Sequence, residues 1–250
     1  MKNSRLGCFS VFMRIFMICI CDYRTPADVL HTLKNEFEVI QLPLDAALPA
    51  PVWGHSDLMI FRLDEYLVTR YKYYSIASRE INLICKKAGL KLILSDSAVG
   101  LKYPNDCGFC AAVSGKNIIC RRSSTDREIL ELACETGYKV LNVPQGYSKC
   151  SCAILADGSI ITADRGIASV TLKNGIDTLL ISEGHVDLPG YSYGFIGGAT
   201  GLCGDTLYFC GDIKTHPDHE AIETFALKHK TKCVSLGHER LYDVGSLIFI

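Results

Sequence analysis

The sequence predicts an α/β fold in which five ββαβ units form a ring within one domain, residues 1–250. Loop landmarks rich in Gly, Asn and Pro recur at intervals of about 40 to 50 residues. Between them, a strand, a helical segment and a second strand follow in the same order. Four intervals also open with an extra strand joined by a tight turn. Such units cannot bury an apolar face alone, but they can when closed around an axis. The expected units are residues 1–54, 55–105, 106–147, 148–194 and 195–250.

Composition excludes several function classes. Lys and Arg number 26 against 27 Asp and Glu, so the chain lacks the basic excess of a nucleic-acid-binding protein. No run of about 18 apolar residues occurs, so no membrane helix is expected. With 48% hydrophobic and 21% charged residues, the chain can form a packed core.

The N-terminal residues have some features of a secretory signal. Lys2 and Arg5 precede a weakly apolar segment, 6–13. Arg14 interrupts this segment and no small-residue cleavage site follows, so a signal peptide is not expected.

The cysteines predict a reduced, cytoplasmic protein. There are 13, an odd number, and most lie in apolar runs where cysteine acts as a small buried hydrophobe. Cys107 and Cys110 have the C-x2-C spacing of a zinc knuckle, but a structural zinc site usually needs a second half-site. Free cysteines, no metal and no cofactor are therefore expected.

The first unit is expected to contain a strand over 14–21, a helix over 25–34 and a strand over 37–42. Thr25 is a candidate N-cap followed by Pro26. No leading hairpin strand is evident. Residues 247–250 are strand-like, and a ring would let them complete this unit.

The second and third units have the hairpin as well. Segments 58–61 and 66–69 pair before a helix over 75–88 and a strand over 90–94, with Gly89 between them. In the third unit, segments 111–113 and 117–120 precede a helix that a Thr125–Glu128 capping box would open, and a strand follows over 139–143.

The fourth and fifth units follow the same plan. Asp157-Gly158 joins strands 152–155 and 159–162, and a helix over 167–173 leads to strand 178–181. Strands 197–202 and 206–209 then precede a helix opened by Pro217-Asp218 and strand 233–236. The glycines of 197–201 resemble a dinucleotide fingerprint, but a strand rather than a helix follows, so phosphate binding is not expected.

Several stretches resemble those of a mainly clostridial family without an assigned reaction, which has the fold of the guanidino-group-modifying enzymes, the five-bladed α/β-propeller or pentein fold. They are residues 22–26, 54–57, 102–104, 145–150, 160–164, 193–198 and 243–246. The enzymes of this fold include arginine and agmatine deiminases, dimethylarginine hydrolases and amidinotransferases. The resemblance implies carboxylates that hold a flat guanidinium, a thiolate that attacks its carbon and a His that moves protons.

The catalytic residues match only in part. Gly184-His185-Val-Asp187 resembles the Gly-His-Val-Asp of agmatine deiminases, which implies that His185 shuttles protons and Asp187 holds the cation. The alternative is a loop histidine. Ile196 stands where those enzymes have a carboxylate. The nucleophilic Cys near their C-terminus is absent, and Ser246 has no recognisable base beside it in sequence.

Cys150 is the candidate substitute nucleophile, because it lies at a unit junction where loops would meet at the axis and Lys149 would favour its thiolate. The alternative is a buried structural cysteine. The polar residues at the junctions could bind a small-molecule substrate, or could act locally as caps and turn residues. These candidate substrate-binding residues are His55, Asp57, Asn105, Gln145, Lys149, Asp164 and Asp212.

Two functions remain open from the sequence. One is a Cys-dependent hydrolase or transferase acting on a guanidino or related C–N compound. The other is a non-catalytic pentein that serves as a binding or scaffold protein, because a fold alone does not determine a reaction.

Overall fold

A computed structural model describes residues 17–250. The segment considered as a signal, 6–13, and the start of the strand expected over 14–21 lie outside the described residues. Within 17–250, no helix is long and apolar enough to cross a membrane.

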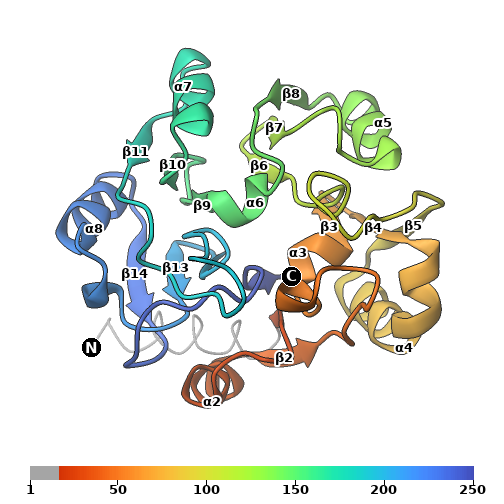
Figure 1. Ribbon diagram of the computed structural model, residues 1–250, viewed down its shortest axis with the longest axis horizontal. Helices are drawn as coiled ribbons and strands as arrows, with labels where there is room; N and C mark the ends of the chain where they lie inside the picture. Colours follow the sequence, from red (N-terminus) through yellow and green to blue (C-terminus); the bar gives the residue numbers. More distant parts are fainter. Residues whose placement is uncertain (1–16) are drawn as a thin grey trace, which may run out of the picture.

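The strands of the described chain form five separate three-stranded sheets, arranged around a common centre (Figure 1). The first contains β15 (Ile248–Phe249), β1 (Ile18–Cys21) and β2 (Glu38–Gln41), with α2 (Ala27–Glu36) before β2. The second contains β3 (Ile60–Leu63), β4 (Tyr66–Arg70) and β5 (Lys91–Ser95), with α4 (Tyr71–Ala88).

The third contains β6 (Ala112–Ser114), β7 (Asn117–Cys120) and β8 (Lys139–Asn142), with α5 (Arg127–Glu135). The fourth contains β9 (Ala153–Ile154), β10 (Ile160–Thr162) and β11 (Thr178–Leu180), with α7 (Arg165–Lys173). The fifth contains β12 (Thr200–Cys203), β13 (Thr206–Phe209) and β14 (Lys232–Ser235), with α8 (His219–Lys228).

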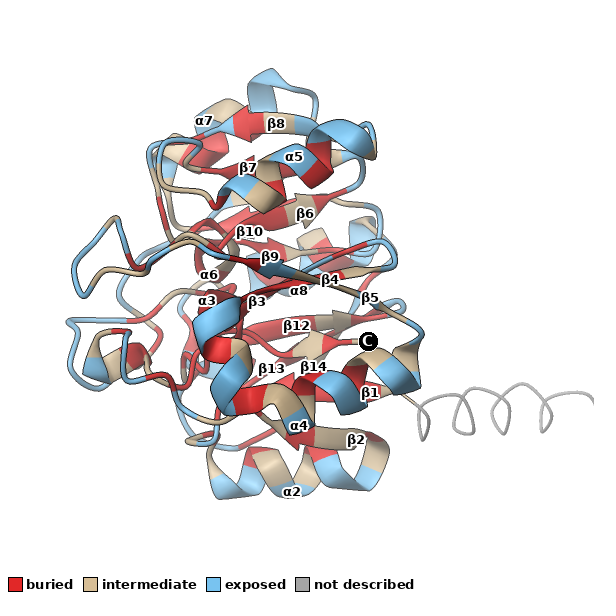
Figure 2. Cartoon of the chain, turned by 90° about the vertical axis from the view of Figure 1, so that its right-hand side faces the viewer, coloured by how far each residue is buried: buried red, intermediate tan, exposed pale blue. Residues whose placement is uncertain are grey.

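All five sheets share one pairing pattern. The middle strand pairs antiparallel with one neighbour and parallel with the other. A tight turn can join antiparallel strands, whereas parallel strands need a crossover, which the helix supplies. The strands are mostly buried, and the helices turn one face to solvent (Figure 2). The predicted α/β class is confirmed.

The C-terminal strand completes the first sheet, as the sequence predicts. Cys19 pairs with Phe249 and Ile20 with Ile248, antiparallel. Ile18 and Ile250 also exchange two backbone hydrogen bonds of 2.9 Å. The two ends of the described chain are therefore joined in one sheet.

Two predicted helix starts are corrected. Helix α2 begins at Ala27, and the Thr25 hydroxyl donates to the carbonyl of Asp22 instead of capping the helix. Helix α5 is capped by Asp126, which accepts from the Glu128 amide, and not by Thr125. Thr125 donates to the carbonyl of Arg121. In both cases the threonine hydroxyl donates to a backbone carbonyl three or four residues earlier, so it does not cap the helix.

Short helices outside the sheets carry polar residues towards the centre. Helix α3 (Ser56–Met59) precedes the second sheet and α6 (Ser148–Ser151) precedes the fourth, and both lie near the middle of the molecule beside the C-terminal segment (Figure 1). The 3-10 helices η1 (Ala50–Val52) and η2 (Ile213–Thr215) lie in other connections.

Candidate active site

Cys150 lies at the centre of a buried group of reactive side chains. Its thiol donates to Asp57 Oδ2 at 3.0 Å, and its Sγ is 3.6 Å from Cys110 Sγ. Helix α6 supplies Cys150, α3 supplies Asp57, and the segment before β6 supplies Cys110. The three side chains come from segments far apart in sequence, so only the folded chain assembles them.

His55 and Asp243 lie on another side of Cys150. Their ligand atoms and Cys150 Sγ all lie within 4.8 Å of one another, and His55 Nδ1 is 3.8 Å from Asp243 Oδ1. Both residues are 1% exposed. We refer to Cys150, Asp57, His55 and Asp243 as the central cluster.

Glycines let the backbone approach this cluster. A Cβ on Gly245, where φ is +63°, would lie 2.4 Å from His55 Cα, and one on Gly198 would lie 2.0 Å from Asp243 Oδ1. Asp243 is fixed by two backbone amides: Phe195 donates to Oδ2 at 2.8 Å and Gly245 to Oδ1 at 2.9 Å. The carboxylate of Asp243 is therefore held in one orientation.

Ser246 has partners that the sequence did not reveal. Lys149 Nζ donates to Ser246 Oγ at 3.0 Å, and Ser246 Oγ lies 2.7 Å from Asp57 Oδ2 as a donor. Ser246 is fully buried and has a φ of +66°, an uncommon conformation for a residue with a side chain. Asp57 thus receives hydrogen bonds from both Ser246 and Cys150.

Burial controls the electrostatics of the central cluster. It raises the pKa of the Cys150 thiol well above its ordinary value, and the hydrogen bond with Cys110 and the charge of Asp57 raise it further. Burial also raises the pKa of the Asp243 carboxyl, against the lowering influence of His55. The thiol form of Cys150 is therefore the resting form, in contrast to the thiolate that Lys149 was expected to favour.

A cavity of about 270 Å³ opens beside the cluster, and we call it the central cavity. Cys150, His55 and Asp243 line it together with several aromatic side chains. The aromatic residues are Tyr147, Tyr191, Tyr193 and Phe195. Tyr147 is anchored because its hydroxyl donates to Asp106 Oδ2 at 2.5 Å. Its ring centroid is 6.2 Å from that of Phe195.

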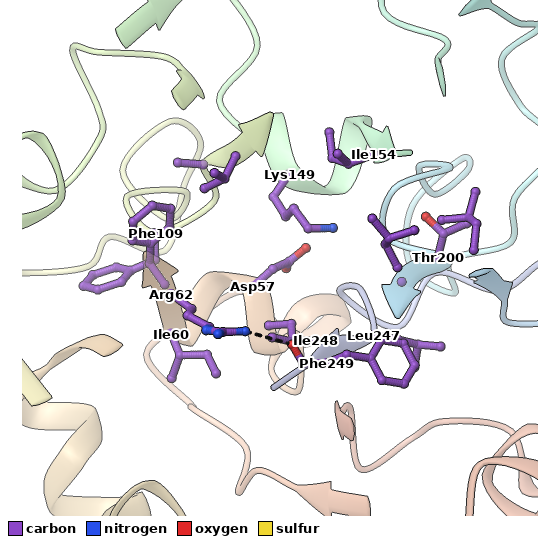
Figure 3. A pocket seen from close by; sticks show the side chains of 16 residues that line it. Asp57, Ile60, Arg62, Phe109, Lys149, Ile154, Thr200, Leu247, Ile248 and Phe249 are labelled. Atoms are coloured by element: carbon purple, nitrogen blue, oxygen red, sulfur yellow. Dashed lines mark hydrogen bonds between the residues drawn. The ribbon is translucent and has the colours of Figure 1, made fainter. Parts of the chain in front are cut away.

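A second cavity, of about 220 Å³, is lined by Asp57 and Lys149 but not by Cys150. Its walls are mostly apolar, and Arg62 reaches it from β3, where its Nη1 donates to the carbonyl of Phe249 at 3.3 Å. Figure 3 shows Lys149 and Asp57 directed towards one another in this cavity. Asp57 is thus shared between the central cluster and the second cavity.

His185, the predicted proton shuttle, lines a third cavity of about 140 Å³ that does not include Cys150 among its lining residues. Two predicted binding residues, Gln145 and Asp164, line the same cavity, and Gln145 Nε2 donates to Asp164 Oδ2 at 3.2 Å. The His185 ring lies 5.2 Å from that of His216. The imidazole beside Cys150 belongs to His55 instead. We call this third space the His185 cavity.

The remaining predicted residues have local contacts away from Cys150. Asp187 Oδ1 is 3.1 Å from Arg240 Nε. Asn105 is exposed and forms a turn with Gly100. Asp212 caps η2 by accepting from the Lys214 amide at 3.0 Å. The contacts of Asn105 and Asp212 match the turn and cap roles that the sequence left open for them, whereas Asp187, predicted to hold the cation, is paired with Arg240.

Cys110 and the aromatic residues of the central cavity were not predicted as site residues. Cys110 belongs to a C-x2-C pair, but its near sulfur in the structure is that of Cys150, and Cys107 instead donates to the carbonyl of Pro104 at 3.0 Å. The C-x2-C pattern therefore pointed to Cys110 as a site residue, but it did not identify Cys150 as the nearby sulfur.

A family model described as a family of unknown function (DUF6873) matches residues 20–248. The chain belongs to this family. Among curated proteins, no match is found.

Solved structures share the fold. A DDAH from Pseudomonas aeruginosa in complex with citrulline is 9% identical, with a TM-score of 0.57 over 88% of this chain and 91% of that one. A dimethylarginine dimethylaminohydrolase adduct with S-methyl-L-thiocitrulline is 10% identical, with a TM-score of 0.56 over the same shares of the two chains. An amidinotransferase of the saxitoxin pathway from Microseira wollei is 11% identical, with a TM-score of 0.52 over 83% of this chain and 72% of that one. The α/β fold with several small sheets therefore matches pentein-fold structures, as the resemblance implied.

Proposed function

We propose that this protein is a Cys-dependent hydrolase or transferase acting on a guanidino or related C–N compound. In this proposal the five sheets are the blades of an α/β-propeller, and the substrate enters the central cavity. The observation that carries it is the central cluster itself: a thiol, an imidazole and two carboxylates, all buried, beside an aromatic cavity.

The cavity suits a flat cation. Asp243 lines it with a fixed carboxylate, and Asp57 lies behind Cys150. A carboxylate can hold a guanidinium through paired charge-assisted hydrogen bonds. A cation in the cavity would lie beside Tyr147 and Tyr191, which line it, and cation–π attraction is strongest in a desolvated site. An incoming cation would also lower the pKa of the Cys150 thiol by offsetting the two negative charges.

The proposed reaction uses the observed contacts. Cys150 Sγ bonds to the central carbon while its proton passes to Asp57 Oδ2, 3.0 Å away. The C–N bond then breaks, and the departing amine takes a proton from the His55 imidazolium. In hydrolysis, water bonds to the carbon and gives a proton to His55. The C–S bond then breaks and the sulfur recovers its proton from Asp57. In a transferase, an amine replaces the water.

The test is turnover of a panel of guanidino compounds (arginine, agmatine, methylated arginines and guanidinoacetate) by the wild type and by Cys150→Ala. We expect a loss of about 10³-fold or more, as for other catalytic nucleophiles. Cys152→Ala is the matched control, since Cys152 is also buried and two residues away. Mass spectrometry of quenched reactions should locate an adduct on the peptide that carries Cys150. Undiminished turnover by Cys150→Ala would overturn the proposal.

The burial of Cys150 favours a second candidate, a non-catalytic binding protein. Cys150 is 2% exposed and the pKa of its thiol is raised, both of which oppose nucleophilic attack. In that case native mass spectrometry against the same panel would show a ligand bound to the chain and released unchanged.

A further inference from the structure

The ligand-type atoms around Cys150 form two overlapping sets. Cys150, His55 and Asp243 form one set, and Cys150, Cys110 and Asp57 form the other, with the ligand atoms of each set within 4.8 Å of one another. All five residues are buried. We propose that the second set, Cys150, Cys110 and Asp57, binds a thiophilic divalent cation, zinc above all, with His55 of the first set beside it.

Unpartnered polar atoms support the site independently. Within residues 17–250, both ring nitrogens of His55 and Oδ1 of Asp57 are buried and have no hydrogen-bond partner. Buried polar groups are nearly always hydrogen-bonded, so each exception calls for a physical reason. A cation held by Cys110, Cys150 and Asp57 would give Asp57 Oδ1 a partner and would lie next to the unpartnered His55 ring, and it would reduce the repulsion between the buried carboxylates.

The donor set selects the metal. Two sulfurs exclude calcium and magnesium, which prefer oxygen ligands, and the mixture of sulfur, imidazole and carboxylate suits zinc. Zn–S bonds of about 2.3 Å in a tetrahedron would place two sulfurs roughly 3.8 Å apart. Cys110 Sγ and Cys150 Sγ are 3.6 Å apart, so little movement is needed. Asp57 supplies the third ligand. His55 lies within 4.8 Å of Cys150 Sγ but belongs to the other set, so it becomes the fourth ligand only by moving towards the ion.

Binding has a defined proton balance. Each thiol loses one proton when its sulfur bonds to zinc, so two protons are released per ion. A zinc ion bonded to Cys150 would also occupy the sulfur assigned above as the nucleophile. That last consequence rests on the proposed function, whereas the metal site itself does not.

Cobalt binding at this site can be followed by its absorption spectrum. Protein stripped with a chelator and kept in a phosphine reductant, which prevents a Cys110–Cys150 disulfide, is titrated with Co²⁺. We expect one ion per chain, with the d–d bands of tetrahedral cobalt and a sulfur-to-cobalt charge-transfer band. Zinc should displace the cobalt, and competition with a chelating dye then gives the zinc affinity.

Two cysteine variants identify the ligands. Cys110→Ala should weaken zinc binding by about 100-fold or more, since a ligand matters at least as much as its supporting shell. Cys107→Ala is the matched control from the same C-x2-C pair and should bind zinc as the wild type does. His55→Gln, which retains a similar size, should also weaken binding. Circular dichroism verifies that each variant is folded.

The outcomes are decisive. No cobalt–sulfur band in the wild type, unchanged affinity in Cys110→Ala, or equal loss in Cys107→Ala would each overturn the metal site. Turnover by metal-free Cys110→Ala separates the two proposals. This variant loses a zinc ligand but retains the nucleophile Cys150, so it should still turn over substrate if the proposed function is right. Cobalt binding by the wild type, together with no turnover of any guanidino compound by the metal-free wild type, would contradict the proposed function alone.

Discussion

The central cluster and the His185 cavity both combine histidine with carboxylate, but their polar atoms are differently engaged. In the His185 cavity, Asp164 caps α7 by accepting from the Ile167 amide at 2.8 Å, and His216 Nδ1 accepts from the Asp218 amide at 3.1 Å. In the central cluster, neither nitrogen of His55 has a hydrogen-bond partner in the described chain. Local structure engages Asp164 and His216 in the first region, whereas in the second it leaves the His55 ring and Asp57 Oδ1 without a hydrogen bond in the described chain.

The largest expected effect is on turnover, which tests whether His55 or His185 moves protons in the reaction. His55→Gln should lower turnover by about 10² to 10⁴-fold, the usual contribution of a general acid or base. His185→Gln should leave turnover within about threefold, because His185 lines another cavity. Steady-state kinetics on the best substrate of the panel measures both. A larger loss in His185→Gln would restore His185 as the proton shuttle and contradict our assignment.

The sequence was sufficient for the α/β class and for the pairing of residues 247–250 with the first sheet, since both follow from apolar patterning and turn residues. It also singled out Cys150, His55 and Asp57, which the structure brings together.

The sequence could not place His185 or find the partner of Cys110. Cys110 and Cys150 are 40 positions apart, and Ser246 and Asp57 are 189 apart. Their contacts depend on how successive sheets pack, which local patterns do not encode. Likewise, a sequence reveals a histidine but not whether its nitrogens will be engaged by local backbone groups.

Replacing one glycine in each region should have a smaller effect, on stability rather than on turnover. Gly198→Ala would place a Cβ 2.0 Å from Asp243 Oδ1 in the central cluster, and two backbone amides hold that carboxylate. We expect a loss of about 1–3 kcal/mol in the free energy of unfolding, typical of overpacking. Urea denaturation measures it.

Gly184→Ala is the control in the His185 cavity. Gly184 has a φ of +88° and nothing within 4 Å of an added Cβ. Its cost should come from backbone strain alone, at roughly 1 kcal/mol. If Gly198→Ala proved the milder variant, Asp243 would not be held as tightly as its contacts indicate.

The smallest expected effect is the pH dependence of stability that His216 contributes. Burial lowers the pKa of this imidazole, with His185 and His219 acting in the same direction and Asp218 opposing them. The folded state therefore binds the proton less readily than the unfolded state, whose histidine pKa is about 6.5. The stabilising contribution of the neutral His216 should be fully present above that pH and should be lost as the pH falls below it. The free energy of unfolding should change with a slope that corresponds to less than one bound proton.

Replacing His216 with Asn, whose side-chain oxygen can still accept from the Asp218 amide, should make the urea midpoint depend less on pH between pH 7.5 and 5.5. An unchanged slope would mean that His216 is protonated as readily in the folded chain as in the unfolded one, and that its burial does not lower its pKa.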